Sequence, residues 1–463
     1  MKIFRDRIIQ NCLVISVLLC GLFLGCQSPS GQPAGWNRVP EILNNIHPPQ
    51  FAQKDFLISD FQAVGDGQTD CTEAFRQAIE TCSGAGGGRV VVPEGIYLTG
   101  AIHLKSNVNL HIAENATILF SQDTRHYLPV VYTRFEGVEC MNYSPFIYAF
   151  EQSNIAITGR GTLDGQADEE TWWPWALPGV CPIQKKDRDN LFHMGDENVP
   201  VEQRVFGEGH FIRPNFIQFY RCKNILIEDV SIRRSPMWEI HPVLCENVTV
   251  RGVDIMSHGP NNDGCNPESS KNVLIKKCHF DTGDDCIAIK SGRNGDGRRI
   301  NTPSENIIIQ DCTMKDGHGG VVLGSEITGG CRNVYAENCT MDSPNLERAL
   351  RIKTNSLRGG IVENIYMRNV RIGQVSDAIL RVNFNYENGD AGQFTPVVKK
   401  IYMKHITSQK SNYVLMLDGY ERSPITHVQL DSCNFEGVSY GNVLNHTDRI
   451  ELNHVWINGQ LQE

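Results

Sequence analysis

Residues 272–278 read N-V-L-I-K-K-C, and this short pattern decides the fold because it recurs along the chain. An asparagine followed by alternating or continuous apolar residues also starts at Asn224, Asn247, Asn306, Asn333 and Asn364. Successive copies begin 23 to 34 residues apart, which is typical of a solenoid whose coils carry insertions of different length. The apolar runs are too short for helical repeats. We therefore predict an all-β fold, a right-handed parallel β-helix.

The position six residues after each asparagine holds either valine or cysteine. These residues are Val230, Val253, Cys278, Cys312, Cys339 and Val370. Such an exchange is expected of a small buried hydrophobic residue. The chain has 16 cysteines, and the 13 that follow residue 26 are an odd number that cannot all pair. We expect core packing at these positions, with disulfides or metal binding as the alternative.

The regions around the repeats define the domain organisation. Asp70 or Thr72 is a suitable N-cap for a short helix with Phe75, Ala78 and Ile79 on one face, and such a helix would cover the open end of the first coil. Weaker repeats continue to the C-terminus without a linker. We therefore expect one β-helix domain over residues 51–463.

The first 26 residues are typical of a bacterial export signal. Basic residues precede a mostly apolar run over residues 8–24, and the following Gly25-Cys26 resembles a lipobox. We expect a signal peptide over residues 1–26 with Cys26 as the lipidated first residue of the mature chain. Ordinary cleavage and an uncleaved anchor are the alternatives. Residues 27–50 are rich in Pro, Gly, Gln and Asn and are predicted to be a tether.

The overall charge excludes some classes of partner. A net charge of −10 and a pI near 5.8 argue against a general nucleic-acid or anionic-membrane binder. They leave room for an acidic substrate that is held by a local basic cluster.

Three carboxylates occupy two turns within residues 257–292. Asp263 lies in N-N-D-G, and Asp284 and Asp285 lie in G-D-D-C. Asp284 and His318 both come twelve residues after their asparagines, so on coils about 4.8 Å apart they should be neighbours. Aligning D-G-C-N with D-D-C-I places Asp263 in the same column, with Asp285 beside it. Crowded carboxylates raise one another's proton affinity, which suits one for general acid and another for general base catalysis.

Two cations follow in R-A-L-R-I-K. Arg351 and Lys353 lie two residues apart, so a strand presents them on one face. Beside an acidic cluster they suit the carboxylate of an acidic sugar, and neutralisation of the aspartates alone is the alternative. Lys290 adds to this basic edge. We expect neither a metal nor a cofactor.

The motifs N-x-D-G, G-D-D, G-H-G and R-I-K, on successive coils, resemble those of the polygalacturonases, family 28 glycoside hydrolases. The resemblance covers nearly the whole mature chain, although Asn262 replaces the threonine of the family's N-T-D. It implies that Asp284 is the general acid and that Asp263 and Asp285 position and activate water. It also implies that His318 tunes the acid, that Arg351 and Lys353 hold the galacturonate carboxylate, and that the anomeric centre is inverted.

Two further stretches look like exo-acting members of that family. They are residues 317–326, G-H-G-G-V-V-L-G-S-E, and residues 235–242, S-P-M-W-E-I-H-P. We include Asn261 and His241 among the expected substrate-binding residues. An insertion over residues 166–214 contains Trp172, Trp173 and Trp175, and it is either a packed loop or a wall of the cleft.

We therefore expect an exo-acting, monomeric hydrolase of pectic poly- or oligosaccharides. It would lie in the periplasm or on the outer membrane of a Gram-negative bacterium as a lipoprotein. A pectate or rhamnogalacturonan lyase on the same fold is one alternative, although it would need a calcium cage and a basic catalytic residue. A non-catalytic carbohydrate-binding β-helix is the other alternative, but it has no need for three aspartates in one column.

Overall fold

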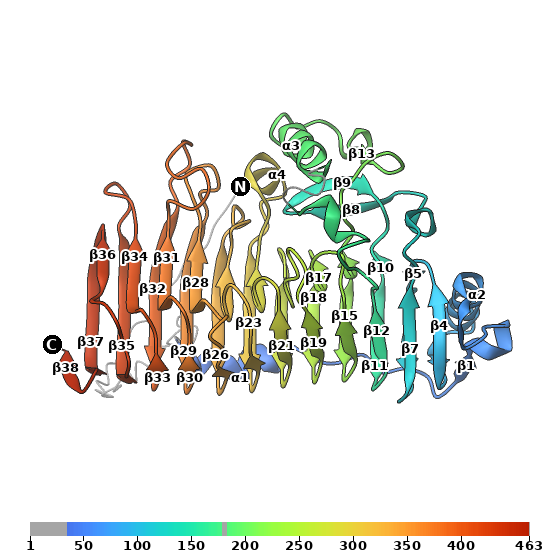
Figure 1. Ribbon diagram of the computed structural model, residues 1–463, viewed down its shortest axis with the longest axis horizontal. Coiled ribbons are helices and arrows are strands. Elements are labelled where there is room, and N and C mark those ends of the chain that lie inside the picture. The colour runs from blue at the N-terminus through green and yellow to red at the C-terminus, as the bar shows by residue number, and fades with distance from the viewer. Residues whose placement is uncertain (1–34, 178–182, 463) are drawn as a thin grey trace, which may run out of the picture.

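Stacked parallel strands form nearly the whole molecule (Figure 1). The structure is a computed structural model, and it describes residues 35–177 and 183–462. The chain winds as a right-handed parallel β-helix from the first coil at one end (blue in Figure 1) to the last coil at the other (red). The predicted fold is therefore confirmed. The predicted signal peptide over residues 1–26, its Cys26 and residues 27–34 lie outside the described residues.

The largest sheet has 25 strands, which form two columns along the length of the molecule. The first column contains β1 (Asp55–Leu57), β3 (Gly88–Val92), β6 (Val108–Ile112), β11 (Ser153–Gly159), β15 (Lys223–Glu228), β18 (Glu246–Arg251), β20 (Lys271–Lys276), β23 (Ser304–Gln310), β26 (Cys331–Glu337), β29 (Ile361–Arg368), β32 (Val397–Lys404), β35 (Ile425–Phe435) and β37 (Thr447–Ile457). The second contains β2 (Asp66–Asp70), β4 (Gly95–Thr99), β7 (Ala116–Phe120), β12 (Thr162–Asp164), β16 (Ser231–Arg233), β19 (Asp254–Ser257), β21 (His279–Thr282), β24 (Thr313–Met314), β27 (Thr340–Met341), β30 (Arg371–Gln374) and β33 (Thr407–Lys410). The last strand, β38 (Gln460–Gln462), folds back and pairs antiparallel with β37.

The remaining face of the β-helix is made of two shorter parallel sheets. One contains β5 (Ile102–His103), β10 (Ile147–Phe150), β14 (Ile217–Tyr220) and β17 (Ile240–Val243). The other contains β22 (Ile287–Ile289), β25 (Val321–Leu323), β28 (Arg348–Lys353), β31 (Ala378–Asn383), β34 (Tyr413–Asp418) and β36 (Val443–Asn445). Cys265 joins the two sheets through isolated bridges to Ile240 and Ile287. The face is thus continuous, and Asp263 lies two residues before the junction.

The repeated asparagines meet a requirement of the backbone. All six adopt the left-handed conformation, with φ between 54° and 61°. Asparagine adopts this conformation more readily than most residues with a side chain. Their side chains also form a ladder, in which Asn306 donates to Asn272 over 3.0 Å and Asn333 donates to Asn306 over 3.2 Å. The ladder explains why the same residue type recurs on each coil.

The valine and cysteine positions lie in the core. All six residues at this position, including Cys278, Cys312 and Cys339, are at most 2% exposed. The twelve cysteines within the described ranges are buried and have free thiols. The prediction of core packing is therefore confirmed, and the disulfide alternative is wrong for these twelve.

Two segments near the N-terminus pack onto the coils, namely helix α2 and residues 35–46. Helix α2 (Thr72–Gly84) covers the first coil as predicted, and Asp70 Oδ1 accepts a hydrogen bond from the Thr72 amide over 2.9 Å. A 3-10 helix, η2 (Ile58–Phe61), precedes it and η3 (Thr124–Tyr127) follows it. The sequence placed a tether over residues 27–50, but residues 35–46 instead form η1 (Gly35–Arg38) and α1 (Val39–Leu43) and pack on the β-helix.

This N-terminal strap, residues 35–47, lies along the flank of coils that are far away in sequence (α1 in Figure 1). Its Val39 and Ile42 are buried with Ile308 and Tyr335. His47 then exchanges two backbone hydrogen bonds with the side chain of Asn247, of 2.9 and 3.0 Å. Apolar side chains spaced along a Pro- and Gln-rich stretch therefore produced a packed strap.

One outgrowth rises from the N-terminal half of the β-helix. It contains the hairpin β8 (Val131–Phe135) and β9 (Val138–Asn142), strand β13 (Val205–Phe206), helices α3 (Ile183–Asp196) and α4 (Asn294–Ile300), and the 3-10 helices η4 (Trp173–Trp175) and η5 (Val201–Gln203). Figure 1 shows these elements above β10 to β23. Within the described ranges, none of the helices has the length and apolar composition needed to cross a membrane.

Candidate active site

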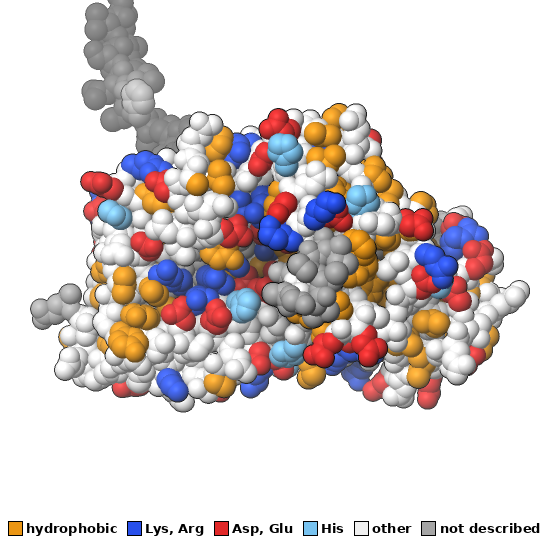
Figure 2. Space-filling model, turned by 45° about the horizontal axis from the view of Figure 1, so that its top comes forward, with side chains coloured by type: hydrophobic (Ala, Val, Ile, Leu, Met, Phe, Trp, Pro, Cys, Tyr) orange, Lys and Arg blue, Asp and Glu red, His pale blue; other side chains and the backbone are white. Residues whose placement is uncertain are grey.

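A hollow of about 190 Å³ lies where the outgrowth meets the outer face of the coils. Figure 2 shows basic and acidic side chains gathered around it. Its lining includes Asp263, Asp284, Asp285 and His318 together with the cations Lys290, Arg351 and Lys353. With Asn261, which also lines the hollow, the structure brings together eight of the nine predicted catalytic and binding residues.

His318 and Asp284 form a hydrogen-bonded pair across adjacent coils. His318 Nδ1 lies 2.9 Å from Asp284 Oδ1, because β22 and β25 pair in register. This hydrogen bond raises the pKa of His318 to about 9. Burial acts to raise the pKa of Asp284, but His318 and Lys353 outweigh it and lower that pKa to about 2. In the free protein the pair is therefore a carboxylate with an imidazolium.

The register of the coils corrects the predicted column. The bridge between Cys265 and Ile287 aligns Asp263 with Asp285, whereas the sequence alignment had placed Asp263 opposite Asp284. Asp263 lies two residues before its paired residue Cys265, whereas Asp284 lies three residues before Ile287, so the first turn is one residue shorter. All three carboxylates still line one hollow.

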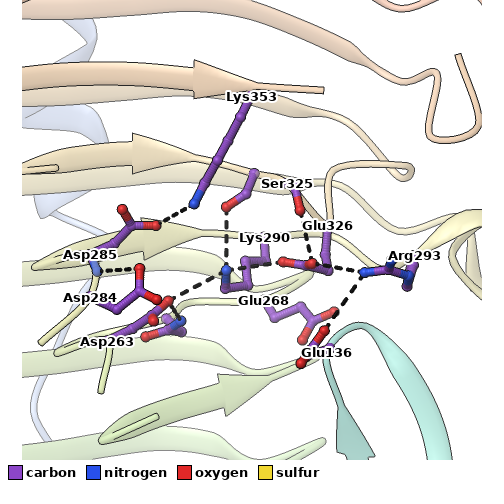
Figure 3. A network of polar contacts seen from close by, with 12 residues as sticks. Glu136, Asp263, Glu268, Asp284, Asp285, Lys290, Arg293, Ser325, Glu326 and Lys353 are labelled. Carbon is purple, nitrogen blue, oxygen red and sulfur yellow. Dashed lines mark hydrogen bonds and ion pairs between the residues drawn. The ribbon is translucent and has the colours of Figure 1, made fainter. Parts of the chain in front are cut away.

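Asp285 is held by the two cations of the R-I-K motif, of which Figure 3 shows Lys353. Lys353 Nζ donates to Asp285 Oδ2 over 2.7 Å, and Arg351 Nη1 lies 3.6 Å from Oδ1. Burial acts to lower the pKa of Lys353, but the charge of Asp285 outweighs it and raises that pKa. Within the described residues, Asp285 Oδ1 is buried and accepts no hydrogen bond.

Asp263 has a different environment. Burial raises its pKa well above the usual range, and the charge of Asp284 adds to the effect. Asn266 Nδ2 donates to Asp263 Oδ2 over 2.7 Å, and Lys290 Nζ lies 3.5 Å from that oxygen. The Asp263 carboxyl, whose pKa is raised, therefore retains a proton more readily in the free protein than that of Asp284, whose pKa is lowered.

Lys290 connects the aspartates to a second ionic group at the closed end of the hollow (Figure 3). Its ammonium contacts Glu326 Oε2 at 3.0 Å and lies 4.4 Å from the centre of the Trp238 ring. Arg293 contacts Glu326 at 3.3 Å and Glu136 at 3.8 Å. Burial acts to raise the pKa of Glu326, but Lys290 and Arg293 lower it well below the usual range. The position of the Lys290 ammonium is thus set on both sides by carboxylates.

His241 is not a substrate contact, which corrects the sequence analysis. Its side chain is 0% exposed, and Nε2 lies 2.8 Å from Glu268 Oε2 while Nδ1 accepts from Asn215 and Gln218. The β8–β9 hairpin covers it, because Gln218 also donates to the Arg134 carbonyl over 3.0 Å. Asn261 does line the hollow, and it accepts a hydrogen bond from Arg213 over 2.7 Å.

The structure places different parts of the insertion in different surroundings. Trp172 is buried and packs edge-on against Tyr127 and Phe146. Trp175, in contrast, lines a neighbouring hollow with Glu136 and Arg188. Arg188 is ion-paired with Glu136, so α3 and the hairpin close the same end of the site.

Several residues of the site carried no usable signal in the sequence. Tyr386 and Glu387 come from the loop after β31, where no repeat marks them, and Tyr386 covers Lys353 at 5.4 Å. Glu136 lies at a hairpin turn that the sequence analysis did not recognise. Glu326, in contrast, ends the G-S-E stretch that the analysis quoted. Only the folded chain shows that these residues surround the aspartates.

The side chains that have the spacing of a metal site lie outside the hollow. Within the described part of the chain, one group of three side chains, His258, Asp281 and Asp316, has metal-binding spacing, and it does not line the hollow. Inside the hollow, lysine and arginine side chains compensate the carboxylates instead.

The sequence of this chain matches a known family of enzymes. The pattern of glycosyl hydrolases family 28 matches residues 82–453. The chain belongs to glycosyl hydrolases family 28. The crystal structure of a hyperthermoactive exopolygalacturonase from Thermotoga maritima is similar, with 46% identity, a TM-score of 0.90, and coverage of 93% of this chain and 98% of that one.

Two relatives extend the comparison of this family 28 hydrolase. A probable polygalacturonase from Vitis vinifera is 31% identical over 80% of this chain and 72% of its own length. An exo-poly-alpha-D-galacturonosidase from Dickeya chrysanthemi is 28% identical over 87% of this chain and 68% of its own length. The family match over residues 82–453 includes the aspartate turns and the R-I-K strand.

Proposed function

We propose that this family 28 hydrolase is an exo-acting polygalacturonase, which releases α-linked galacturonic acid from the ends of pectic chains. One observation carries the proposal: three aspartates and the cations Arg351 and Lys353 share a hollow that is closed on one side. The aspartates suit hydrolysis of a glycosidic bond, and the cations suit a sugar carboxylate. The names of the relatives from Thermotoga maritima and Dickeya chrysanthemi support the same substrate and mode.

In this proposal the three aspartates have separate roles. Asp284 is the most exposed of them, at 17% of its side chain, and it donates a proton to the glycosidic oxygen. Asp285 accepts a proton from water through its free Oδ1 as that water attacks the anomeric carbon. The carbon–oxygen bond to the leaving sugar breaks in the same step, so the configuration inverts. Asp263, on the coil next to Asp285, orients the water.

A proton must reach Asp284 before it acts, because its carboxyl is ionised in the free protein. Lys353 is one of the charges that hold this pKa down. When a substrate carboxylate binds Arg351 and Lys353, it cancels part of their charge, so the proton affinity of Asp284 rises. We therefore expect substrate binding and proton uptake to be coupled.

The shape of the site accounts for exo action. The hairpin β8–β9 and α3 bury the outer face of β14 and β17, where Gln218 and His241 are 0% exposed. A chain that passes over the catalytic coil cannot continue in that direction. The terminal sugar lies at the closed end and the rest of the chain extends toward β31 and β34.

Product analysis tests this proposal. Purified enzyme is incubated with oligogalacturonides of defined length, and products are followed by chromatography and by NMR of the anomeric proton. We expect galacturonic acid from the first time point, released as the β-anomer. A spread of product lengths would contradict exo action, an unsaturated uronate would indicate a lyase, and no product from any pectic substrate would favour the carbohydrate-binding alternative.

We also propose that the enzyme is an exported, monomeric lipoprotein of a Gram-negative bacterium. The basic and apolar N-terminal run and the Leu-Gly-Cys26 sequence support export and lipidation. Labelling cells with a fatty acid should mark the wild-type protein but not a Cys26→Ala variant. Light scattering of the protein without residues 1–26 should give the mass of one chain.

A further inference from the structure

One row of outward-facing side chains crosses the whole active-site face. Strand pairing places Gln218 beside His241 at the closed end. At the other end it places Arg351 of β28 beside Arg381 of β31, and Arg381 beside Met416 of β34. The exposure of the row changes along its length. Gln218 and His241 are fully buried, whereas Arg351, Arg381 and Met416 are partly exposed.

Arg381 differs from the other arginines around the hollow. Arg351 contacts Asp285, Arg348 contacts Glu347 and Asp377, and Arg293 contacts Glu326. Within the described residues, Arg381 forms no ion pair, and its one hydrogen bond is a long one of 3.4 Å from Nη1 to the Met416 carbonyl.

The carboxylates nearest to Arg381 are already occupied. Asp377 accepts a hydrogen bond from Arg348 Nε over 2.7 Å, and Asp418 accepts one from Asn385 over 2.9 Å. Burial lowers the pKa of Arg381, and the positive charges of Arg348 and Arg351 lower it further, while Asp377 and Asp418 act in the opposite direction. A half-buried guanidinium beside two other cations is stabilised by an additional anion.

The surface around Arg381 suits an acidic sugar. Figure 2 shows a group of basic side chains beside the hollow, over the coils that contain β28 and β31. A guanidinium recognises a carboxylate with two donors.

We propose that Arg381 binds the carboxylate of the second sugar in the leaving group. This inference rests on the proposed function, in which the terminal sugar occupies the closed end. Arg351 and Lys353 then hold the first sugar of the leaving group, which lies next to the bond that breaks. Arg381 lies one coil farther, about 4.8 Å away along the axis, in the direction in which the row becomes exposed. The enzyme therefore binds at least three consecutive acidic sugars.

Chain-length dependence tests the proposal. KM and kcat are measured for digalacturonate and trigalacturonate with wild-type enzyme, Arg381→Gln, and Arg381→Lys as the conservative variant. Arg371→Gln is the matched control, because Arg371 is exposed on β30 in the other sheet. We expect Arg381→Gln to lower kcat/KM for trigalacturonate about 10- to 100-fold through KM, the range for one charged hydrogen-bonded contact. Digalacturonate kinetics should stay unchanged, and Arg381→Lys should restore part of the loss.

The outcomes separate this inference from the proposed function. Equal losses on both substrates, or no loss on either, would overturn the role of Arg381 while leaving the hydrolase activity established. Failure of the wild-type enzyme to cleave either galacturonide would overturn the proposed function itself. Unchanged thermal unfolding of Arg381→Gln shows that a measured loss does not come from misfolding.

Discussion

The imidazole of His318 is hydrogen-bonded to the carboxylate of Asp284 over 2.9 Å, although the two residues are 34 positions apart in the chain. Adjacent strands β22 and β25 bring them together, and the pairing continues through Val321 and Val322 beside Ile287 and Ala288. Side-chain geometry at the catalytic centre therefore depends on backbone register. This contact orients the most exposed of the three aspartates at the mouth of the hollow.

Removing the proposed acid should stop hydrolysis without unfolding the protein. Asp284→Asn keeps the shape of the side chain but cannot transfer a proton, so we expect kcat on trigalacturonate to fall by at least about 10²- to 10⁴-fold. The measurement is steady-state kinetics beside a thermal melt. Activity near the wild-type value would show that another group is the acid.

The His318–Asp284 pair should stabilise the fold within a limited pH range. The pKa of His318 is raised from 6.5 to about 9, so its contribution is complete below 6.5 and is lost as the pH rises through about 9. The pKa of Asp284 is lowered from 3.8 to about 2, so its contribution is complete above 3.8 and is lost as the pH falls through about 2. His318→Gln should therefore lower the melting temperature most between pH 3.8 and 6.5, and least above pH 9.

The same pair can be observed directly by NMR. The imidazole resonances of His318 should titrate with a pKa near 9 in the wild-type protein. Asp284→Asn should bring that pKa back toward the ordinary value, because the hydrogen bond to a carboxylate is its largest cause. A His318 pKa that Asp284→Asn leaves unchanged would contradict the assignment.

Lys353 and Asp285 should be energetically coupled. Lys353→Met leaves a buried carboxylate without its 2.7 Å partner, so we expect the free energy of unfolding to fall by about 3–5 kcal/mol. Adding Asp285→Asn removes the unpaired charge and should recover part of that loss. Urea denaturation of both single variants and the double variant measures the coupling. Additive losses would show that the two groups act independently.

The asparagine ladder can be tested at Asn306. Asn306→Ala loses hydrogen bonds on both sides and also the short polar side chain that lets asparagine tolerate the left-handed backbone at φ 58°, so we expect a loss of about 2–3 kcal/mol in the free energy of unfolding. Asn306→Gly loses the same hydrogen bonds but accepts the backbone conformation, so it should cost less. Denaturant midpoints measure the difference, and an alanine variant at least as stable as the glycine variant would argue against backbone strain.

The catalytic pairings were predictable to different degrees. Counting from the repeated asparagines was enough to place His318 beside Asp284, because both turns have the same length after their strands. Aligning D-G-C-N with D-D-C-I misplaced Asp263 by one residue, because Cys265 pairs with Ile287 and not with Cys286. His241 looked like a site residue from its motif, but a hairpin about a hundred residues earlier in the chain covers it.

The sequence by itself determined the coil. A left-handed backbone position recurs on every turn, and so does a small buried side chain, and both are local requirements that each repeat must satisfy within a few residues. Tertiary structure alone decided which end of the site is closed and which of the described cations form ion pairs. The hairpin, α3 and the loop with Tyr386 leave the β-helix and return over it, and their positions depend on long-range packing that no periodic pattern encodes. For the same reason Arg381 became distinctive only when its neighbours' ion pairs were known.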